Sequence, residues 1–517
     1  MSKNFYATTP IYYVNDKPHI GHAYSTVLTD VLTRFHRLFG FDASFMTGVD
    51  EHGQKVQKAA AAKGVSPQAH VDEYNLHFKN LWAKLNVEYI HFIRTTDGYH
   101  KDFVRDVLQK LYDKGEIYSK EYSGWYSVGE ERFFEESELV DGKDPISHRT
   151  VEWLQEKNYF FKMSKYQQTL IDYINANPSF IMPDFRKNEV LGFLKQPLND
   201  LCISRPKSRL AWGIPLPFDE DFVTYVWVDA LVNYISGVQN FKHKDGSAFW
   251  PADFHIIGKD ILTTHSVYWT TILFALGWQQ PKHILAHGWW LIDGSKMSKT
   301  SGTGINPMDY VDNYGVDVFR YFLIREMVVG LDATFSHDSF VRRINSDLAN
   351  DLGNGLNRIH KLILSNFDGK IPAVAGGISG SSWGEQEKEL EGYSAKAIEF
   401  ARANIGEVKL SLVVEEVLNS VKALNRYLEA TVPWKLSKGG EAEHEKLAVV
   451  LYAGAEVLRI ALALLSPIMP QKCEVGRLML GAPIIDENSL RFGVLQGGET
   501  LGKGEALFPR IVEKTEE

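Results

Sequence analysis

An alternation of short apolar runs with helical segments, seen twice within the first 64 residues, leaves few folds open to this chain. Residues 5–11 (FYATTPI) are apolar and β-branched, and a turn with Pro18 separates them from a segment of helical period. A second apolar run, residues 41–50, precedes a helix predicted over 54–62 that Gly64 stops. This alternation predicts an α/β fold with a parallel sheet, which binds ligands at the carboxyl ends of its strands. The apolar face of the first predicted helix consists of Ile20, Tyr24, Val27, Leu28, Val31, Leu32 and Phe35.

The alternation of strands and helices is interrupted once by a different pattern and is later replaced by long helices, which divides the chain into several predicted domains. Residues 119–217 contain short strand-like pieces and clustered aromatic side chains, and we interpret them as an insertion. The alternation then returns, so residues 1–118 and 218–339 are predicted to be two halves of one sheet domain. Residues 340–517 are predicted to form a separate helical domain, because a single hydrophobic core stops growing well below 517 residues. Its long helices are expected over 340–367, 386–404, 408–431 and 443–466.

Composition excludes several classes of protein. A hydrophobic fraction of 44% is too high for intrinsic disorder, and two distant cysteines, Cys202 and Cys473, cannot form a disulfide framework or a cysteine-rich zinc site. The N-terminus has no apolar segment typical of a secretory signal, so we expect a cytoplasmic protein. The most apolar stretch, residues 447–470, is interrupted by Glu456 and Arg459 and predicts a buried helix, not a membrane span. The net charge of −9 does not exclude a local basic surface for nucleic acid.

The first candidate site is Pro18-His19-Ile20-Gly21-His22, at the start of the first predicted helix. A helix N-terminus has unpaired N–H groups and a positive dipole end, which suit a phosphate. Gly21 leaves room for a flat base against the backbone, and His19 and His22 can donate hydrogen bonds to phosphate oxygens. Taken alone, the pattern is better explained by two capping or core histidines.

The second candidate site is the glycine-flanked basic segment 293–302 (DGSKMSKTSG). Such a loop can close over a triphosphate, and Lys296 and Lys299 can neutralise the charge that develops as pyrophosphate leaves. The alternative is an ordinary solvated basic loop. Both motifs occur in this order in the two halves of the predicted sheet, and this pairing favours the functional interpretation.

With these two motifs, the sequence resembles the class I aminoacyl-tRNA synthetases, and the segments between the motifs resemble the methionyl branch of that family over nearly the whole chain. The resemblance implies a Rossmann-like parallel-sheet catalytic domain with an inserted connective domain, followed by an all-α anticodon-binding bundle. It also implies that L-methionine is activated by ATP with Mg²⁺ and transferred to the terminal adenosine of tRNA(Met), which supplies translation. The implied catalytic residues are His19, His22, Lys296 and Lys299.

The resemblance also assigns the substrate contacts. Asp50 would bind the substrate ammonium, where a charge-assisted hydrogen bond fixes the amino group and orients the reacting carboxylate. Taken without the resemblance, Asp50 is a candidate N-cap for the helix that begins at Gln54. Positions 227, 230, 231 and 234 would then be an ordinary core face of a helix. The implied methionine contacts are Ile11, Tyr13, Asp50, Trp227, Ala230, Leu231, Tyr234, Ile261 and His265. The implied ATP contacts are His19, Gly21, His22, Gly258, Asp260, Trp290, Lys296, Met297, Ser298 and Lys299.

In the helical domain, the resemblance implies an anticodon site. Asn354 and Arg358 lie four residues apart, on one face of a predicted helix, and Pro433-Trp434 follows later. Trp434 would stack on a base while Asn354 and Arg358 contact base edges or phosphate, a common way to recognise single-stranded loops. The alternative for Trp434 is a core aromatic that caps a helix.

Three departures from the family pattern matter. Where relatives carry a zinc knuckle of cysteine pairs, this chain has Ser127, Glu130, Asp144 and Ser147, so no structural zinc and no other bound metal are expected. The second motif ends in Thr300 instead of serine, which keeps a hydroxyl. The sequence ends at residue 517 without the appended RNA-binding module of some relatives, so a monomer is the expected state.

Three rival functions remain open from the sequence. Another nucleotidyltransferase of the same fold would lack the helices after residue 340. The cysteine-specific synthetase would need a zinc site that two isolated cysteines do not provide. A non-enzymatic RNA-binding relative would be expected to have lost His22 or Lys299, and both are present.

Overall fold

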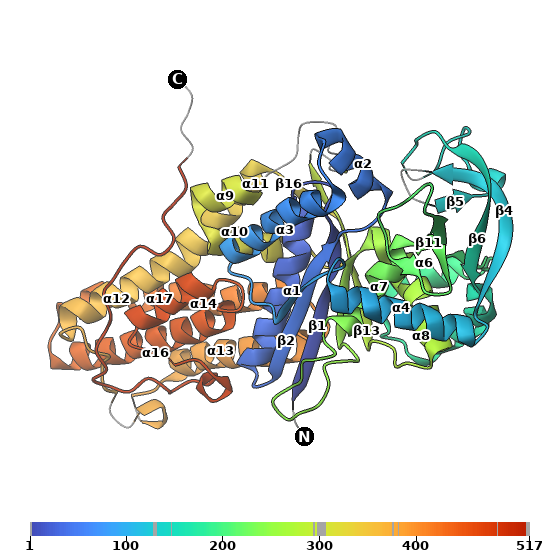
Figure 1. Ribbon diagram of the computed structural model, residues 1–517. Coiled ribbons are helices and arrows are strands. Elements are labelled where there is room, and N and C mark those ends of the chain that lie inside the picture. The colour runs from blue at the N-terminus through green and yellow to red at the C-terminus, as the bar shows by residue number, and fades with distance from the viewer. Residues whose placement is uncertain are drawn as a thin grey trace.

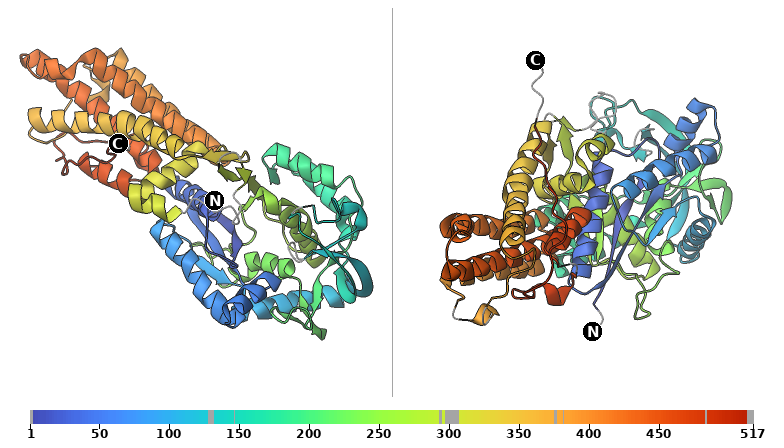
Figure 2. Two further views of the ribbon diagram at one scale, coloured as in Figure 1. Left: turned by 90° about the horizontal axis from the view of Figure 1, so that it is seen from above. Right: turned by 90° about the vertical axis from the view of Figure 1, so that its left-hand side faces the viewer.

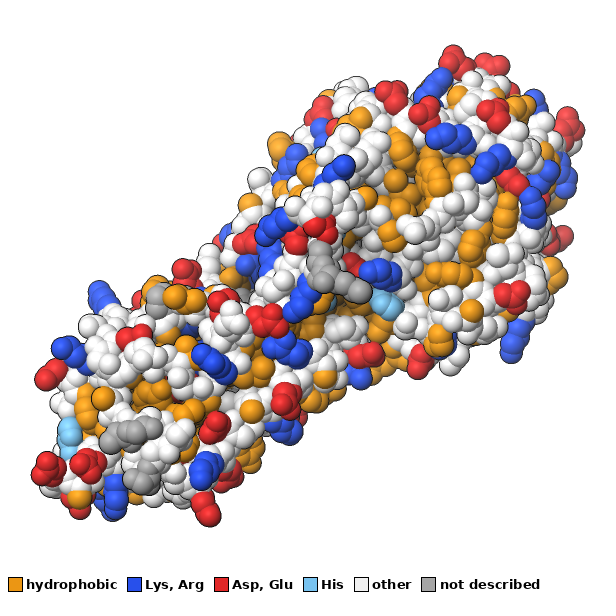
Figure 3. All heavy atoms as spheres, turned by 90° about the horizontal axis from the view of Figure 1, so that it is seen from below, with side chains coloured by type: hydrophobic (Ala, Val, Ile, Leu, Met, Phe, Trp, Pro, Cys, Tyr) orange, Lys and Arg blue, Asp and Glu red, His pale blue; other side chains and the backbone are white. Residues whose placement is uncertain are grey.

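The computed structural model describes residues 3–127, 132–145, 147–292, 295–296, 307–374, 377–380, 382–482 and 484–512. The molecule is elongated, with a sheet domain in the middle, the segment after α4 (Gly98–Asp113) at one end and a helical bundle at the other (Figures 1 and 2). On the face in Figure 3, basic and acidic side chains are interspersed along the whole length.

The central sheet has six parallel strands in the order β3-β2-β1-β12-β13-β7. Strand β1 pairs with β12, so the two predicted halves of the sheet domain meet at the middle of the sheet. At this position the strand order reverses, and the carboxyl ends of β1 and β12 open a crevice for a ligand. The predicted α/β class is confirmed. The strands span Asn4–Tyr13 (β1), Asp42–Asp50 (β2), His91–Arg94 (β3), Ile181–Met182 (β7), Phe254–Gly258 (β12) and His283–His287 (β13).

The first predicted helix is confirmed as α1, Ile20–Leu38. Its predicted apolar face is buried against the sheet, because a 3.6-residue period places those side chains on one side. Helix α2, Gln54–Lys63, ends at Gly64 in a left-handed conformation, as the sequence predicts. The next helices are α3 (Pro67–Lys84) and α4.

The segment after α4 is built on two long antiparallel strands, β4 (Ile117–Ser127) and β6 (Glu152–Phe161). It also contains two helices that the sequence analysis did not predict, α5 (Gln167–Ala176) and α6 (Asp184–Phe193). Strand β7 lies within the predicted insertion yet pairs with β13, so this segment adds an edge strand to the central sheet. The shorter strands are Arg132–Phe134 (β5), Leu201–Cys202 (β8), Ser204–Pro206 (β9), Pro215–Leu216 (β10) and Asp219–Thr224 (β11).

Three of the four positions that replace zinc-ligand cysteines come together around one buried carboxylate. Asp144 accepts from the Ser127 hydroxyl at 2.7 Å, from the Ser147 backbone N–H at 2.6 Å, and from the Ser147 hydroxyl. Glu130 lies outside the described residues. A carboxylate with these donors closes the turn by hydrogen bonds, the role that a metal would otherwise perform.

We therefore expect the purified protein to contain less than about 0.1 zinc ions per chain, since serine hydroxyls are poor ligands for zinc. Elemental analysis after purification without chelator measures this content directly. Treatment with EDTA should leave the thermal unfolding midpoint unchanged. Stoichiometric zinc, or a fall in the midpoint on chelation, would contradict this expectation.

The chain returns to the sheet domain through α7, Val226–Ser236, which packs beside α4. After β12, a 3₁₀ turn (η3, Lys259–Ile261) and a π-helical segment (η4, Thr264–Trp269) lead into α8, Thr270–Leu276. A small second sheet follows, with strands β14 (Trp290–Ile292), β15 (Ser295–Lys296) and β16 (Ala333–Phe335). Helices α9 (Pro307–Tyr314) and α10 (Val316–Glu326) lie between β15 and β16 in the chain, and α10 packs against the helical bundle.

The helical bundle agrees with the predicted helices. Helices α11 (His337–Arg343) and α12 (Asn354–Asn366) are joined by a π-helical segment, η5 (Ile344–Gly353). The other helices are α13 (Glu385–Asn404), α14 (Leu410–Thr431), α15 (Pro433–Leu436), α16 (Glu441–Leu465) and α17 (Pro470–Met479).

Helix α16 is the apolar segment of the sequence analysis. Within the described ranges, it is the one helix long and apolar enough to cross a membrane, and the apolar stretch that gives it this character is entirely buried in the protein. Glu456 and Arg459 form a buried ion pair of 2.7 Å, and Arg459 also donates to the carbonyls of Ser489 and Arg491. These contacts fix the C-terminal segment against the helix, as expected for a helix in the core of a bundle.

One buried arginine joins the bundle to the sheet domain. Arg320 on α10 pairs with Asp30 on α1 at 2.6 Å and donates to the carbonyls of Pro467 and Ile468 in the turn between α16 and α17. It also donates to the carbonyl of Leu85, which follows α3. Both side chains of the pair are almost fully buried, so the contact between helix α1 and the bundle is shielded from solvent.

Candidate active site

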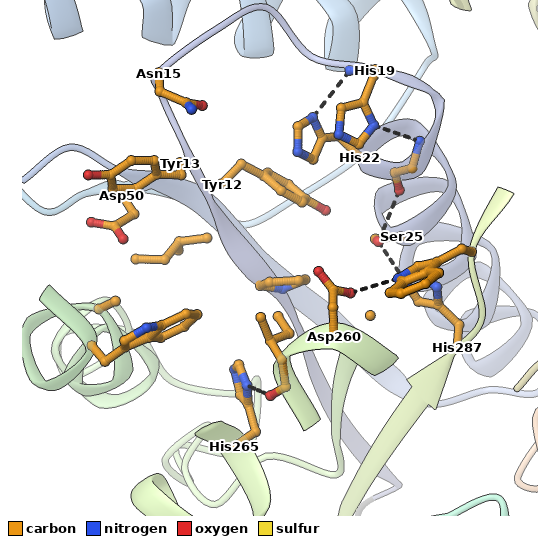
Figure 4. Close-up of a pocket in the computed structure, with 18 of the residues that line it drawn as sticks. Tyr12, Tyr13, Asn15, His19, His22, Ser25, Asp50, Asp260, His265 and His287 are labelled. Atoms are coloured by element: carbon orange, nitrogen blue, oxygen red, sulfur yellow. Dashed lines mark hydrogen bonds between the residues drawn. The ribbon is translucent and has the colours of Figure 1, made fainter. Parts of the chain in front are cut away.

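A cavity of about 430 Å³ lies at the carboxyl ends of β1, β2 and β12, at the reversal of strand order. Figure 4 shows Tyr13 and Asp50 on one side of it and His19, His22 and His287 on the other. Every residue predicted to contact methionine lines this cavity: Ile11, Tyr13, Asp50, Trp227, Ala230, Leu231, Tyr234, Ile261 and His265. Six of the residues predicted to contact ATP also line this cavity: His19, Gly21, His22, Gly258, Asp260 and Trp290.

The basic loop lies mostly outside the described residues. The backbone of Lys296 belongs to β15, which pairs with β14 next to the cavity-lining Trp290. Met297, Ser298 and Lys299 lie outside the described residues, as does Thr300. Their predicted roles remain predictions.

His19 and His22 cap helix α1, so the structural interpretation of this motif is correct and is compatible with the functional one. The Gly21 backbone N–H donates to His19 Nδ1 at 3.0 Å, and the His19 N–H donates to His22 Nδ1 at 3.2 Å. A ring nitrogen that accepts a hydrogen bond carries no proton, so we assign the proton of each neutral ring to Nε2. The two rings stack at 3.8 Å at the cavity wall, where these Nε2–H groups suit phosphate oxygens.

Two positions in the cavity wall, Gly21 and Gly258, have no room for a side chain because another group lies close to the backbone. A Cβ atom on Gly21 would lie 2.9 Å from the His19 ring, and one on Gly258 would lie 2.5 Å from the Asp260 carboxylate. Heavy atoms this close clash, so a side chain at either position would displace a group that lines the cavity.

Asp50 is the last residue of β2, opposite Tyr13 in the sheet register. The helix N-cap interpretation of Asp50 is wrong, because the N-cap of α2 is Gly53. The following residues hold the loop in place: Glu51 pairs with Arg94 at 2.8 Å, and Trp212 donates to the Glu51 carbonyl at 2.6 Å. Asp50 is nearly buried and belongs to a rigid loop, a suitable position for a carboxylate that binds a cation.

The opposite wall of the cavity is apolar and aromatic. Trp227, Ala230, Leu231 and Tyr234 share one face of α7, and the last three are also core residues, so the core-stripe interpretation is correct for them as well. Tyr234 lies 2.6 Å from His265 Nε2, while His265 Nδ1 lies 2.9 Å from the Ile261 carbonyl. Burial lowers the pKa of His265 to about 4, so the ring is neutral and accepts the tyrosine hydroxyl. Neutral, polarizable walls of this kind suit a thioether.

The side of the cavity at the ends of β12 and β13 contains residues that the sequence analysis missed. Trp289 donates its indole N–H to Asp260 at 3.1 Å, and its ring contacts the Lys259 ammonium. His287, at the end of β13, bonds to Ser25 on α1 at 2.7 Å. Position at the end of a buried strand could have indicated His287, since that edge of a parallel sheet binds ligands. The other cavity residues that were missed are Pro10, Tyr12, Asn15, Ile20, Lys55, Val226 and Gly288.

Trp290 contributes to the core as well as to the cavity. Its ring packs edge-on against Tyr24 and against Phe335, and only 4% of the residue is exposed. Such packing makes Trp290 a fixed part of the cavity wall.

The predicted anticodon residues lie on the bundle. Asn354 is exposed and Arg358 partly exposed, one turn apart on α12. Trp434 lies on the one-turn helix α15 and is 44% exposed, so the core interpretation of this aromatic is wrong. Pro433 is buried at the first position of that helix and fixes the backbone before Trp434. An exposed indole can stack on an unpaired base.

The fold and this cavity define a class I tRNA synthetase. The family model described as "tRNA synthetases class I (M)" matches residues 5–152 and 135–360, more than half of the chain. The chain belongs to this family.

Characterised relatives and solved structures agree with this membership. A methionine–tRNA ligase of Caldanaerobacter subterraneus is 44% identical over 99% of this chain and 80% of its own length. The methionine–tRNA ligase of Rickettsia felis is 43% identical over 99% of both chains. The structure of Mycobacterium tuberculosis methionyl-tRNA synthetase in complex with methionyl-adenylate superposes with a TM-score of 0.93 at 39% identity, covering 98% of this chain and 100% of that one.

Proposed function

We propose that this chain is a methionine–tRNA ligase, which activates L-methionine with ATP and transfers the methionyl group to tRNA(Met). The observation that carries the proposal is a single cavity with a carboxylate at one side, a neutral aromatic wall at the other, and the histidine-capped end of α1 beside them. Membership of the family and the high identity to methionine–tRNA ligases support the same function.

In the proposed site, Asp50 binds the ammonium group of methionine and the α7 face encloses its side chain. Ile11, Tyr13, Ile261 and His265 complete the methionine contacts. Gly258 and Asp260 bind the ribose of ATP, and Trp290 supports the base. Magnesium enters with the ATP phosphates; within the described ranges, no group of three His, Cys, Asp or Glu residues is arranged to hold a metal.

The first step is an in-line attack of the methionine carboxylate on the α-phosphate, which forms methionyl-adenylate and releases pyrophosphate. No protein nucleophile is needed, so the rate depends on positioning and on charge stabilisation. His19 and His22 donate from Nε2 to phosphate oxygens, and Lys296 and Lys299 neutralise the leaving pyrophosphate. In the second step, the 2′-hydroxyl of the terminal adenosine attacks the carbonyl carbon of the adenylate and loses its proton, which forms the methionyl ester and releases AMP. Asn354, Arg358, Pro433 and Trp434 bind the anticodon, and the enzyme acts as a cytoplasmic monomer.

Exchange between ATP and pyrophosphate, measured separately with methionine, cysteine and leucine, tests this function. We expect exchange with methionine that exceeds exchange with either other amino acid by at least about 10²-fold, since an apolar pocket discriminates by ~1–3 kcal/mol for each methylene. Exchange that prefers cysteine or leucine would assign the chain to a different synthetase, and no exchange at all would favour a non-enzymatic RNA-binding role.

Replacing Lys299 with alanine should lower the exchange rate constant at saturating methionine by about 10²–10³-fold, the usual effect of removing one group that stabilises the transition state. The KM for methionine should change less than about threefold. Lys282→Ala is the matched control, because its ammonium pairs with Asp253 on the surface and does not line the cavity. Unchanged exchange in Lys299→Ala would remove this lysine from the mechanism.

A further inference from the structure

We propose that a buried bridge of His52, Asp229 and His100 holds the two sides of the methionine cavity at a fixed separation and so determines the affinity for methionine. The bridge makes no contact with substrate, so its members are positioning residues. This inference rests on the proposed function, because it assumes that Asp50 and the α7 face bind opposite ends of the same amino acid.

The bridge is centred on one carboxylate. Asp229 Oδ2 lies 2.6 Å from His52 Nδ1, and Asp229 Oδ1 lies 2.8 Å from His100 Nε2. All three side chains are at most 5% exposed. Burial alone would raise the pKa of Asp229, but His52 and His100 outweigh burial and the pKa lies below its usual value. The carboxylate is therefore ionised, and both imidazoles donate to it.

One end of the bridge belongs to the loop that carries Asp50. His52 is two residues after Asp50, and its ring also packs against Trp212 at 5.3 Å between centroids. Trp212 in turn donates to the carbonyl of Glu51. The bond from His52 to Asp229 therefore connects the Asp50 loop directly to helix α7.

The other end fixes helix α7 along its length. Asp229 lies in the same helix as Trp227, Ala230 and Tyr234, which line the cavity, but Asp229 itself does not line it. His100 on α4 contacts α7 twice, at Asp229 and, through Nδ1 at 2.7 Å, at Ser236. Two contacts seven residues apart prevent the helix from tilting, so the apolar wall keeps its distance from Asp50.

A fixed separation matters because Asp50 and the α7 face must contact opposite ends of one methionine molecule at the same time. A site that is already held in its binding geometry loses less conformational freedom when the ligand binds, and it therefore binds more tightly. A loosened bridge should weaken methionine binding while the ATP contacts from α1 and β12 stay in place.

Matched amide substitutions test the bridge atom by atom. The Asn side-chain nitrogen occupies roughly the position of histidine Nδ1, and the Gln nitrogen that of Nε2. His52 uses Nδ1 and His100 uses Nε2 toward Asp229, so the two positions should respond in opposite ways. We expect His52→Asn and His100→Gln to keep the methionine KM within about threefold, whereas His52→Gln and His100→Asn raise it at least about tenfold. The KM for ATP should change less than about twofold in all four variants.

KM values do not depend on the fraction of enzyme that is folded, so partial unfolding cannot produce this pattern. If His52→Gln and His100→Asn yield no folded enzyme, Ser236→Ala serves instead, because it removes only the second contact of His100 with α7; a rise of at least about fivefold in methionine KM is expected. Equal methionine KM in all folded variants, or parallel changes in methionine and ATP KM, would overturn the inference. Wild-type enzyme without methionine-dependent exchange would instead overturn the proposed function.

Discussion

Replacing Asp50 with asparagine should reduce kcat/KM for methionine by about 10²–10⁴-fold in ATP–pyrophosphate exchange. The substitution keeps the shape of the side chain and removes only its charge. Asp50 is nearly buried, and a charged substrate group that loses its buried partner typically costs about 3–5 kcal/mol. The KM for ATP should stay within about threefold, since the nucleotide contacts come from α1, β12 and the segments after β12 and β13.

Asp42→Asn is the matched control for this prediction. Asp42 is the first residue of the same strand that ends in Asp50, but it does not line the cavity. It pairs with His243 and accepts from the Lys244 backbone. We expect exchange kinetics of this control within about twofold of wild type. A loss of less than tenfold in Asp50→Asn would mean that another group binds the ammonium.

Replacing Arg320 with methionine should lower the free energy of unfolding by about 3–5 kcal/mol, because it leaves the Asp30 carboxylate buried without the Arg320 guanidinium. Arg320 also satisfies the carbonyls of Leu85, Pro467 and Ile468, which a thioether cannot replace. Urea denaturation followed by far-ultraviolet circular dichroism measures the change.

Two further variants show whether the effect comes from the buried pair. Asp30→Asn combined with Arg320→Met should recover part of the loss, since a neutral amide at position 30 no longer needs the Arg320 guanidinium, although it also gives up the ion pair of Asp30 with Arg34. Arg402→Met, which breaks an exposed ion pair with Glu487, should change stability by less than about 1 kcal/mol. A destabilisation below about 1 kcal/mol in Arg320→Met would show that the contacts between domains do not depend on this pair.

The elements with strong local signals were predictable from the sequence. Helix α1 has a clear 3.6-residue period. Helix α2 ends at Gly64, because a glycine readily adopts the left-handed conformation found there. Strand β7 was missed because two residues carry no periodicity, and its place in the sheet depends on pairing with β13 about 100 residues away. Helices α5 and α6 are only ten residues long and lie within a segment of mixed pattern. Sequence patterns report which face is buried, while the partner of that face is set by tertiary packing.

The same limit applies to the site. Residues in recognisable motifs, such as His19 and Asp50, could be assigned from the sequence, and the cavity brings them together. Trp289, which bonds to Asp260, and the bridge between His52 and Asp229 join positions far apart in the chain. A tryptophan or a histidine in isolation does not indicate such a partner, because its hydrogen-bond partner is decided by the fold.

The central claim, that this chain attaches methionine to tRNA, is tested most directly by aminoacylation with radiolabelled methionine. The substrates are a tRNA(Met) transcript and the same transcript with an altered anticodon. We expect charging of the first, and a reduction of at least about 10²-fold in kcat/KM with the second, since an altered base would leave the polar groups of Asn354 and Arg358, which we propose to contact base edges, without their hydrogen-bond partners. Failure to charge tRNA(Met) by an enzyme that is active in ATP–pyrophosphate exchange would contradict the account.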